Sequence, residues 1–432
     1  MPSRVLAWIL SATLLVACDS APTTDSMATL KQVFAERPTV ADEDNAFLDV
    51  FGFLGPADQD AHELGVRRVT WLLKFHAEPK TAGPDPAVPG LVTKGHRTQA
   101  LNQIIDACRA AMARACSSAL DRARDTKLLS EIEPVLLQRY AALLGRRGWM
   151  EIDTVYPTSP LPSYDGTIEA QRLALIRLRQ VASGDAGKIR TSLERDLAFW
   201  RGVMASSDSL FSKVIALSAV RQHFALGSFV LHDLPADQLD RAIPESWRRP
   251  FTELERSMLR PMAGEFMREE AQTRGSEEQL HQAEVQGEGE VVEEPRRGLV
   301  IDLGRRNVGP PKLVDYANYY LVAANAYRVP LSEYETVSKE LRGKYHTVTS
   351  RGWDVTQYAT RVASAEGMRR AALLALELRS KGVAPADVAR QLEESTSRNP
   401  YDGKPFVWDA ADQAIVFTGP ESRKYRRQSY PY

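Results

Sequence analysis

Histidines, cysteines and closely spaced acidic residues are the side chains best suited to catalysis or metal binding. The seven histidines of this chain are scattered, at His62, His76, His96, His223, His232, His281 and His346. Only His223 and His232 are near neighbours, and a separation of nine residues does not place them on one helix face. The sequence lacks a nucleophile elbow, a His-Glu-x-x-His helix and a phosphate-binding loop. We therefore interpret the histidines as packing or solvent-contacting residues, and predict no catalytic residue, metal site or cofactor.

The first of the three cysteines, Cys18, follows a segment typical of an export signal. Arg4 gives it a positive start, and the thirteen residues Val5–Ala17 carry no charge. A membrane span needs about twenty apolar residues, so this stretch is too short to remain as an anchor. Leu15-Val16-Ala17-Cys18 resembles the lipobox of bacterial lipoproteins. The resemblance implies that residues 1–17 are removed as a signal peptide, and that Cys18 is acylated on its thiol and on its new amine.

The residues after Cys18 indicate where such a lipoprotein would reside. Residues 18–26 are polar and suit a tether, which argues against the alternative of an ordinary signal peptide with a chance cysteine. Two or more acyl chains give stable anchoring, so we expect a periplasmic protein held on the lipid bilayer by Cys18. In the enteric sorting rule, an Asp directly after the lipidated cysteine favours retention at the inner membrane. Asp19 therefore favours the inner over the outer membrane.

The other two cysteines, Cys108 and Cys116, form an even pair in what would be an oxidising compartment. In one unbroken helix their Cα atoms would lie about 12 Å apart, whereas a disulfide needs less than about 7 Å. The intervening residues contain neither Gly nor Pro. Either the helix ends within this run and the disulfide forms, or both cysteines are free and buried. We favour the disulfide, because free thiols are uncommon in such compartments.

The rest of the chain has mainly helical periodicity. The residues Ile189, Leu193, Leu197, Trp200 and Met204 follow the 3.6-residue period. The segment Ser209–Val230 is apolar on nearly all faces, which predicts a central helix. Phe406–Trp408 and Ile415–Phe417 are predicted to form a β-hairpin. The predicted fold class is mainly α, with antiparallel helical hairpins packed in a bundle or irregular solenoid and a small C-terminal β-hairpin.

One internal segment differs from its surroundings. Residues 275–298 hold seven acidic residues and no aromatic residue, a composition that does not bury enough apolar surface to order itself. We predict a disordered acidic loop there. The expected organisation is therefore a signal peptide (1–17), a polar tether (18–26), a helical body (27–274), the acidic loop (275–298), and a helical C-terminal part with the hairpin and a basic tail (299–432).

Two features near the C-terminus have alternative interpretations. Residues 399–405 resemble a turn of type II secretion pseudopilins that can help to shape a calcium site, and they also suit a simple Pro/Gly turn that sets the hairpin register. Asp402 and Asp412 are candidate oxygen ligands for a weak ion site. The basic tail contains Arg423, Lys424, Tyr425, Arg426, Arg427, Tyr430 and Tyr432. It suits anionic phospholipid, solvent or a protein interface.

A large helical lipoprotein without an active-site motif is better explained as a binding protein than as an enzyme. The net charge of −1 gives no reason to expect nucleic acid as a partner. In kind, the chain resembles periplasmic immunity lipoproteins, which bind a secreted effector such as a lipase or cell-wall hydrolase and block its active site. The resemblance rests on Leu15–Cys18, the tether and the cysteine pair, and it identifies no effector-binding residue. The alternatives are a structural or assembly lipoprotein of an envelope complex and a hydrolase with a site built from distant carboxylates.

Overall fold

The computed structural model describes residues 23–78, 83, 90–91, 93–109, 112–152, 162–181, 184–285, 312–349, 354–419 and 427–432. For residues 23–25, 109 and 276–285 only the backbone is described. The predicted signal peptide, Cys18 and Asp19 lie outside these residues. Helix α1 (Thr23–Ala35) begins within the predicted tether, so Thr23–Ser26 belong to a helix and the tether as predicted is too long.

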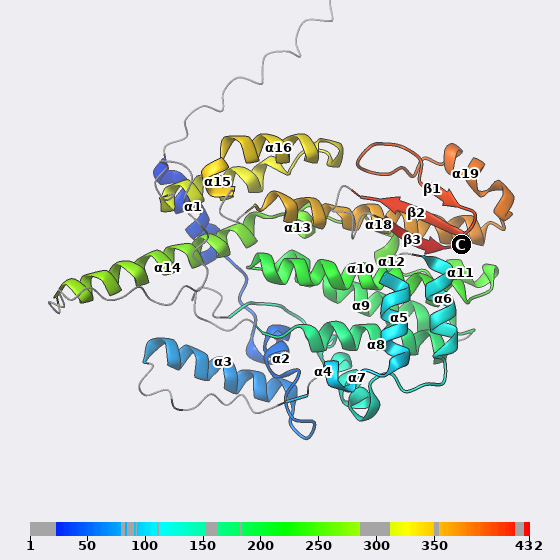
Figure 1. The fold of residues 1–432 in the computed structure, drawn as a ribbon, viewed down its shortest axis with the longest axis horizontal. Helices are drawn as coiled ribbons and strands as arrows, with labels where there is room; N and C mark the ends of the chain where they lie inside the picture. The colour runs from blue at the N-terminus through cyan, green and yellow to red at the C-terminus, as the bar shows by residue number, and fades with distance from the viewer. Residues whose placement is uncertain are drawn as a thin grey trace, which may run out of the picture.

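The fold is mainly α, as predicted, and its centre is helix α10 (Leu210–His232). It packs against α8 (Asp165–Val181), α9 (Ala186–Ser206) and α18 (Thr356–Ser380), and Figure 1 shows α18 and α8 on opposite sides of it. Among the described helices, α10 alone is long and apolar enough to cross a membrane by length and composition. Because 67% of its most apolar window is buried inside the protein, it serves here as the core helix that its apolar faces predicted.

Helix α9 confirms the periodicity argument. Its residues Ile189, Leu193, Leu197, Trp200 and Met204 are all buried, each at most 2% exposed. Asp185 caps its first turn by accepting a hydrogen bond from Lys188 N at 2.9 Å. The opposite face of α9 reaches the surface, with Arg195, Ala198 and Gly202 exposed. That outer face becomes one wall of the groove described below.

Smaller helices surround this centre in hairpins and short connections (Figure 1). Their bounds are α2 (Ala46–Gly52), α3 (Ala61–Ala77), α4 (Thr93–His96), α5 (Gln99–Arg109), α6 (Ala113–Arg122), α7 (Glu133–Leu143), α11 (Leu239–Ala242), α12 (Glu245–Arg248), α13 (Glu253–Arg256), α14 (Leu259–Val285), α15 (Leu313–Ala326), α16 (Tyr334–Lys344), α17 (His346–Thr349) and α19 (Val388–Glu394). Single 3-10 turns occur at Asp42–Asp44, Ser130–Ile132, Ala236–Gln238, Leu331–Glu333 and Pro385–Asp387.

Helix α14 corrects part of the predicted acidic loop. It continues to Val285, so residues 275–285 are helical and do not form a loop. Glu and Gln make up half of residues 276–285, and none of these residues is Gly or Pro, so the helix propensity of the stretch is high despite its charge. The remainder of the predicted loop, residues 286–298, lies outside the described residues.

The C-terminal sheet contains the predicted hairpin and one further strand. Strands β1 (Val407–Asp409) and β2 (Ala414–Thr418) are antiparallel, and β3 (Arg427–Pro431) pairs with the other edge of β2. Figure 1 shows the sheet beside α18 at the end of the molecule that also holds α5 and α6. Part of the predicted basic tail is therefore structural, since Tyr430 is 1% exposed and lies in the core. Arg423, Lys424, Tyr425 and Arg426 lie outside the described residues.

The cysteine pair behaves as predicted. Helix α5 ends at Arg109 and α6 begins at Ala113, so the helix breaks between the two cysteines. This break brings the Cα atoms of Cys108 and Cys116 to 4.4 Å, and the two residues form a disulfide. The bond joins α5 to α6 in a tight hairpin, close to where α6 contacts β3.

Candidate functional site

His223 is the histidine with the most enzyme-like surroundings. Its Nδ1 lies 2.6 Å from Asp196 Oδ2, and Trp247 Nε1 donates a hydrogen bond of 2.7 Å to its Nε2. Since Nε2 accepts this bond, the network assigns the ring proton to Nδ1, which donates to Asp196. The imidazole is 0% exposed, and both ring nitrogens are occupied by protein groups. This Asp–His pair therefore positions α9, α10 and Trp247 and has no access to a substrate.

The hydrogen bonds of Asp196 explain why the Asp196–His223 pair is buried without a large free-energy cost. Its carboxylate also accepts from Gln171 Nε2 at 3.0 Å and from the Tyr140 hydroxyl. Burial, together with the neighbouring Asp196 charge, raises the pKa of Tyr140 well above its usual value, which keeps the phenol protonated as a donor. A buried carboxylate with three donors is satisfied.

The other histidines do not assemble into a site. His62 Nδ1 lies 2.8 Å from Asp49 Oδ2, which also receives Arg146 Nε at 2.9 Å. Among the described residues, no group of three or more His, Cys, Asp and Glu side chains is arranged to hold a metal ion. His281 is among the residues described only by their backbone.

Three buried carboxylates gather where α10 begins. Glu151 Oε1 accepts from the backbone N–H groups of Asp208 (2.8 Å) and Ser209 (3.2 Å), and Glu265 Oε1 accepts from Leu210 N (2.9 Å). Burial raises the pKa of Glu151 to about 7, with the Asp208 charge adding to the effect. Burial also raises the pKa of Asp208 to about 6, against the opposing charges of Arg37 and Arg260.

A carboxyl group with a raised pKa is what a general acid requires, so this cluster is where a hydrolase built from distant carboxylates would be sought. Glu151 and Asp208 are each 1% exposed, however. Glu151 is fully engaged with the backbone N–H groups of the two residues that precede α10 and with the hydroxyl of its N-cap, Ser209 Oγ, at 2.7 Å. We assign the cluster to capping of the core helix.

The candidate ion ligands near the C-terminus, Asp402 and Asp412, each accept hydrogen bonds from a different part of the chain. Asp412 reaches from the β1–β2 turn to α6, where its carboxylate accepts from the backbone N–H groups of Ala113 and Arg114. Asp402 Oδ1 instead accepts from Lys404 N at 3.1 Å within the turn of residues 399–405. Asn399 accepts from Tyr401 N, and Gly403 has a φ of +66°. The segment therefore forms a Pro/Gly turn, and each of the two carboxylates is bonded to backbone N–H groups of a different segment.

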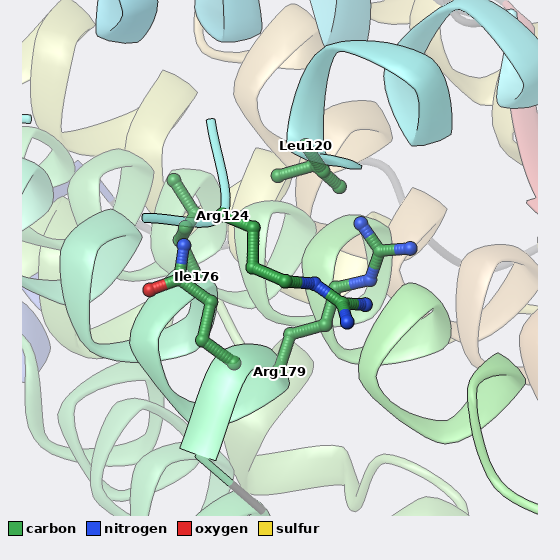
Figure 2. A pocket seen from close by; sticks show the side chains of 5 residues that line it. Leu120, Arg124, Ile176 and Arg179 are labelled. Atoms are coloured by element: carbon green, nitrogen blue, oxygen red, sulfur yellow. The ribbon is translucent and has the colours of Figure 1, made fainter. Parts of the chain in front are cut away.

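Two of the surface hollows suit a ligand poorly. Figure 2 shows a crevice between α6 and α8 where the Arg124 and Arg179 side chains converge, and its volume of about 10 Å³ is barely enough for one water molecule. A wider hollow of about 680 Å³ lies at the start of α9, lined by Arg190 and Arg241 among others. None of its lining residues is buried, and the cap Asp185 already occupies the helix N-terminus.

A third hollow is larger than the crevice and, unlike the wider hollow, includes the buried residues Trp149 and Val203 in its lining. This groove of about 320 Å³ lies between residues 144–149 and the outer face of α9. Its wall on α9 presents Arg195, Phe199 and Gly202, and the opposite wall presents Arg147 and Trp149. The complete lining is Leu144, Arg146, Arg147, Gly148, Trp149, Arg195, Ala198, Phe199, Gly202, Val203 and Ser206. We call it the α9 groove.

The wall opposite α9 is held in place by the start of α2. Asn45 is 0% exposed, and its side chain accepts from Met150 N at 3.0 Å and donates to Met150 O at 2.9 Å. Backbone bonds join Ala46 N to Gly148 O and Gly148 N to Asp44 O, both at 3.0 Å. A Cβ at Gly148 would lie 2.5 Å from Val40, so this close approach requires glycine.

The charge of the α9 groove is positive. Arg146 is tied to Asp49, and Arg147 Nε lies 2.9 Å from Asp44. Arg195 bonds only to main-chain carbonyls, donating to Ala141 O at 2.8 Å and Leu144 O at 3.4 Å. No Asp, Glu or His lines the groove. The arrangement provides cationic donors beside an aromatic surface, which suits an anionic ligand.

Trp149 contributes a mostly buried indole to this wall. The indole is 5% exposed and packs edge-on against Phe47, with ring centroids 5.4 Å apart. Its buried Nε1 has no hydrogen-bond partner among the described residues. A buried donor without a partner is unusual in a folded protein, but this nitrogen has almost no accessible surface, so a ligand in the groove does not reach it.

Sequence patterns did not reveal this groove. Arg146 and Arg195 are separated by 49 residues in sequence, and they line one groove because Arg195 bonds to the main chain at the end of α7. The single usable signal was Arg-Arg-Gly-Trp at residues 146–149, a basic and aromatic run that follows a helix. Comparison of this chain with protein-family models, curated proteins and solved structures found no match.

Proposed function

We propose that this protein is a lipid-anchored periplasmic immunity protein that binds a secreted effector, a lipase or a cell-wall hydrolase, and blocks its active site. The observation that carries the proposal is the composition of the α9 groove. It offers cationic and aromatic binding groups, but no histidine or carboxylate that would activate Ser206 or water. The described groups with enzyme-like environments, His223 and Glu151, are buried.

The N-terminal sequence supports the proposed location. The lipobox-like Leu15–Cys18 and the polar residues that follow would hold the protein on the periplasmic face of the membrane, the inner membrane on the evidence of Asp19. Tethering would place an inhibitor beside the bilayer that a lipase attacks. The Cys108–Cys116 disulfide is compatible with an oxidising compartment.

Inhibition by occlusion requires surface and no chemistry of the inhibitor's own. Specific interfaces bury at least about 1,200 Å² in total, and the rigid packing of α9 against the core provides a stable platform. The helix is fixed from within by Trp200, which is 0% exposed and donates to Tyr140 Oη at 2.9 Å. An interface built on such a helix would lose little conformational entropy when it binds a partner.

A genetic experiment tests the proposal. Each secreted lipase and cell-wall hydrolase of the same genome would be expressed with an export signal in a strain that lacks the gene for this protein. One of them should lyse the deletion strain and spare the strain that carries the wild-type gene. If the deletion strain resists all of them, and the protein instead co-purifies with a multi-subunit envelope complex, the alternative of a structural or assembly lipoprotein replaces the proposal.

A further inference from the structure

We propose that the α9 groove binds an acidic segment of the partner protein, whose carboxylates contact Arg147 and Arg195. This inference rests on the proposed function and deepens it, because it names the surface and the chemistry of recognition. Two properties of the groove lead to it: the positive charge of Arg195, which has no carboxylate partner among the described residues, and the open small-residue face of α9.

The charge is available at two of the three arginines. Arg195 has no carboxylate partner among the described residues, so its positive charge is free to pair with a ligand. Arg147 is 81% exposed and contacts Asp44 through Nε, which leaves the outer edge of its guanidinium open. Guanidinium groups bind carboxylates in a bidentate manner. Arg146, tied to the buried Asp49, holds the wall in place.

The shape of α9 allows close approach. Ala198, Gly202 and Ser206 recur at intervals of four residues and therefore lie along one face of the helix. A Cβ added at Gly202 would meet no atom within 4 Å, so the space above this residue is open. Phe199 flanks the small residues with an apolar ring. Apolar side chains of a ligand would pack here while its carboxylates reach the arginines.

The length of the groove favours a polypeptide as the occupant. From Arg195 to Ser206 the helix rises by roughly 16 Å, at about 1.5 Å per residue. About five residues of extended chain cover that length, at about 3.3 Å per residue. A small carboxylic acid would contact one end only.

Binding of defined peptides to the full-length protein tests this inference. The probe is a fluorescein-labelled peptide in which Glu and Phe alternate, and its control has Gln in place of Glu. Fluorescence anisotropy should show binding of the Glu peptide that weakens as salt rises, and at least tenfold weaker binding of the Gln peptide. Arg195→Gln and Arg147→Gln should each weaken the Glu peptide about tenfold. Arg190→Gln, an exposed arginine of the same helix outside the groove, should not.

A matched pair at Gly202 separates charge from shape. Gly202→Glu and Gly202→Gln fill the same open space, and a helical surface glycine tolerates both because nothing lies above it. Gly202→Glu should weaken binding of the Glu peptide at least tenfold more than Gly202→Gln does. Three results would overturn the inference. The two Gly202 variants could affect binding equally, or the Glu and Gln peptides could bind equally well. The protein could also bind the small tricarboxylate tricarballylate and neither peptide.

The inference and the proposed function fail in different ways. If the peptide results hold but no effector is inhibited, the groove is an acidic-segment site and the immunity proposal is wrong. If wild-type protein inhibits an effector and Gly202→Glu inhibits it equally well, the immunity proposal stands and the groove is not the binding surface.

Discussion

Glu151→Gln should make the protein less sensitive to pH between about 5 and 8. The side chain is 1% exposed, and burial raises its pKa from 4.5 to about 7. Because the folded-state pKa lies above the unfolded value, the unfolded chain releases this proton first as pH rises. The Glu151 contribution to stability is therefore present below about pH 4.5 and is lost as pH rises to about 7.

The size of the change in stability follows from the shift in the pKa of Glu151. A difference of one pKa unit corresponds to about 1.4 kcal/mol, so the full shift sets an upper limit of about 3 kcal/mol on the change. Glutamine keeps an oxygen for Asp208 N and Ser209 N, and its amide can donate to Ser209 Oγ. The variant should thus preserve the cap of α10 without the buried charge.

Guanidinium unfolding of both proteins at a series of pH values would measure this change in the free energy of unfolding. The stability of Glu151→Gln minus that of the wild type should increase between pH 5 and pH 8, approaching the limit above. Taking the difference at each pH removes the contribution of Lys213, whose pKa burial lowers to about 7 and whose stability effect rises above that pH. The exposed Glu131 provides the control, as Glu131→Gln. A difference that stays constant or decreases across this range would refute the reasoning.

Two further predictions concern the cysteines. Cys18→Ser should abolish lipid attachment, so metabolic labelling with a fatty acid should mark the wild-type protein only; a labelled variant would reject the lipobox interpretation. Native Cys108 and Cys116 should resist alkylation until reduced, and Cys108→Ser with Cys116→Ser should lower the unfolding free energy by about 2–3 kcal/mol in the loop-entropy account. An unchanged unfolding midpoint in the double variant would show that the disulfide adds nothing to stability.

Elements defined by local periodicity could be predicted from the sequence. The buried stripe of α9, the all-round apolar α10 and the β1–β2 hairpin depend on residues close together in the chain, and each is found in the structure. The disulfide was predicted from the even cysteine pair and the expected oxidising compartment, whereas the helix break that allows it, between Arg109 and Ala113, had no Gly or Pro to indicate it. Strand β3 was missed because Arg427–Pro431 carries charge and polarity, and its burial comes from tertiary packing of Tyr430.

The candidate site depends on contacts that local patterns do not encode. Asp412 caps α6 across 299 residues, and Asn45 positions Met150 across 105 residues. The α9 groove exists because such long-range bonds bring the Arg146–Trp149 run against α9. A pattern of charges in sequence gives no information about which arginines retain a free positive charge after folding, since that depends on partners such as Asp49 for Arg146.

An inhibition assay tests most directly whether this protein blocks a secreted hydrolase. The purified protein would be titrated into the hydrolase that lyses the deletion strain, with turnover of the hydrolase's lipid or cell-wall substrate as the readout. The immunity proposal predicts loss of hydrolase activity at a one-to-one molar ratio, and the groove inference adds that Arg190→Gln retains this inhibition and Gly202→Glu loses it. Full hydrolase activity in an excess of the wild-type protein, or turnover of the substrate by this protein alone, would contradict it.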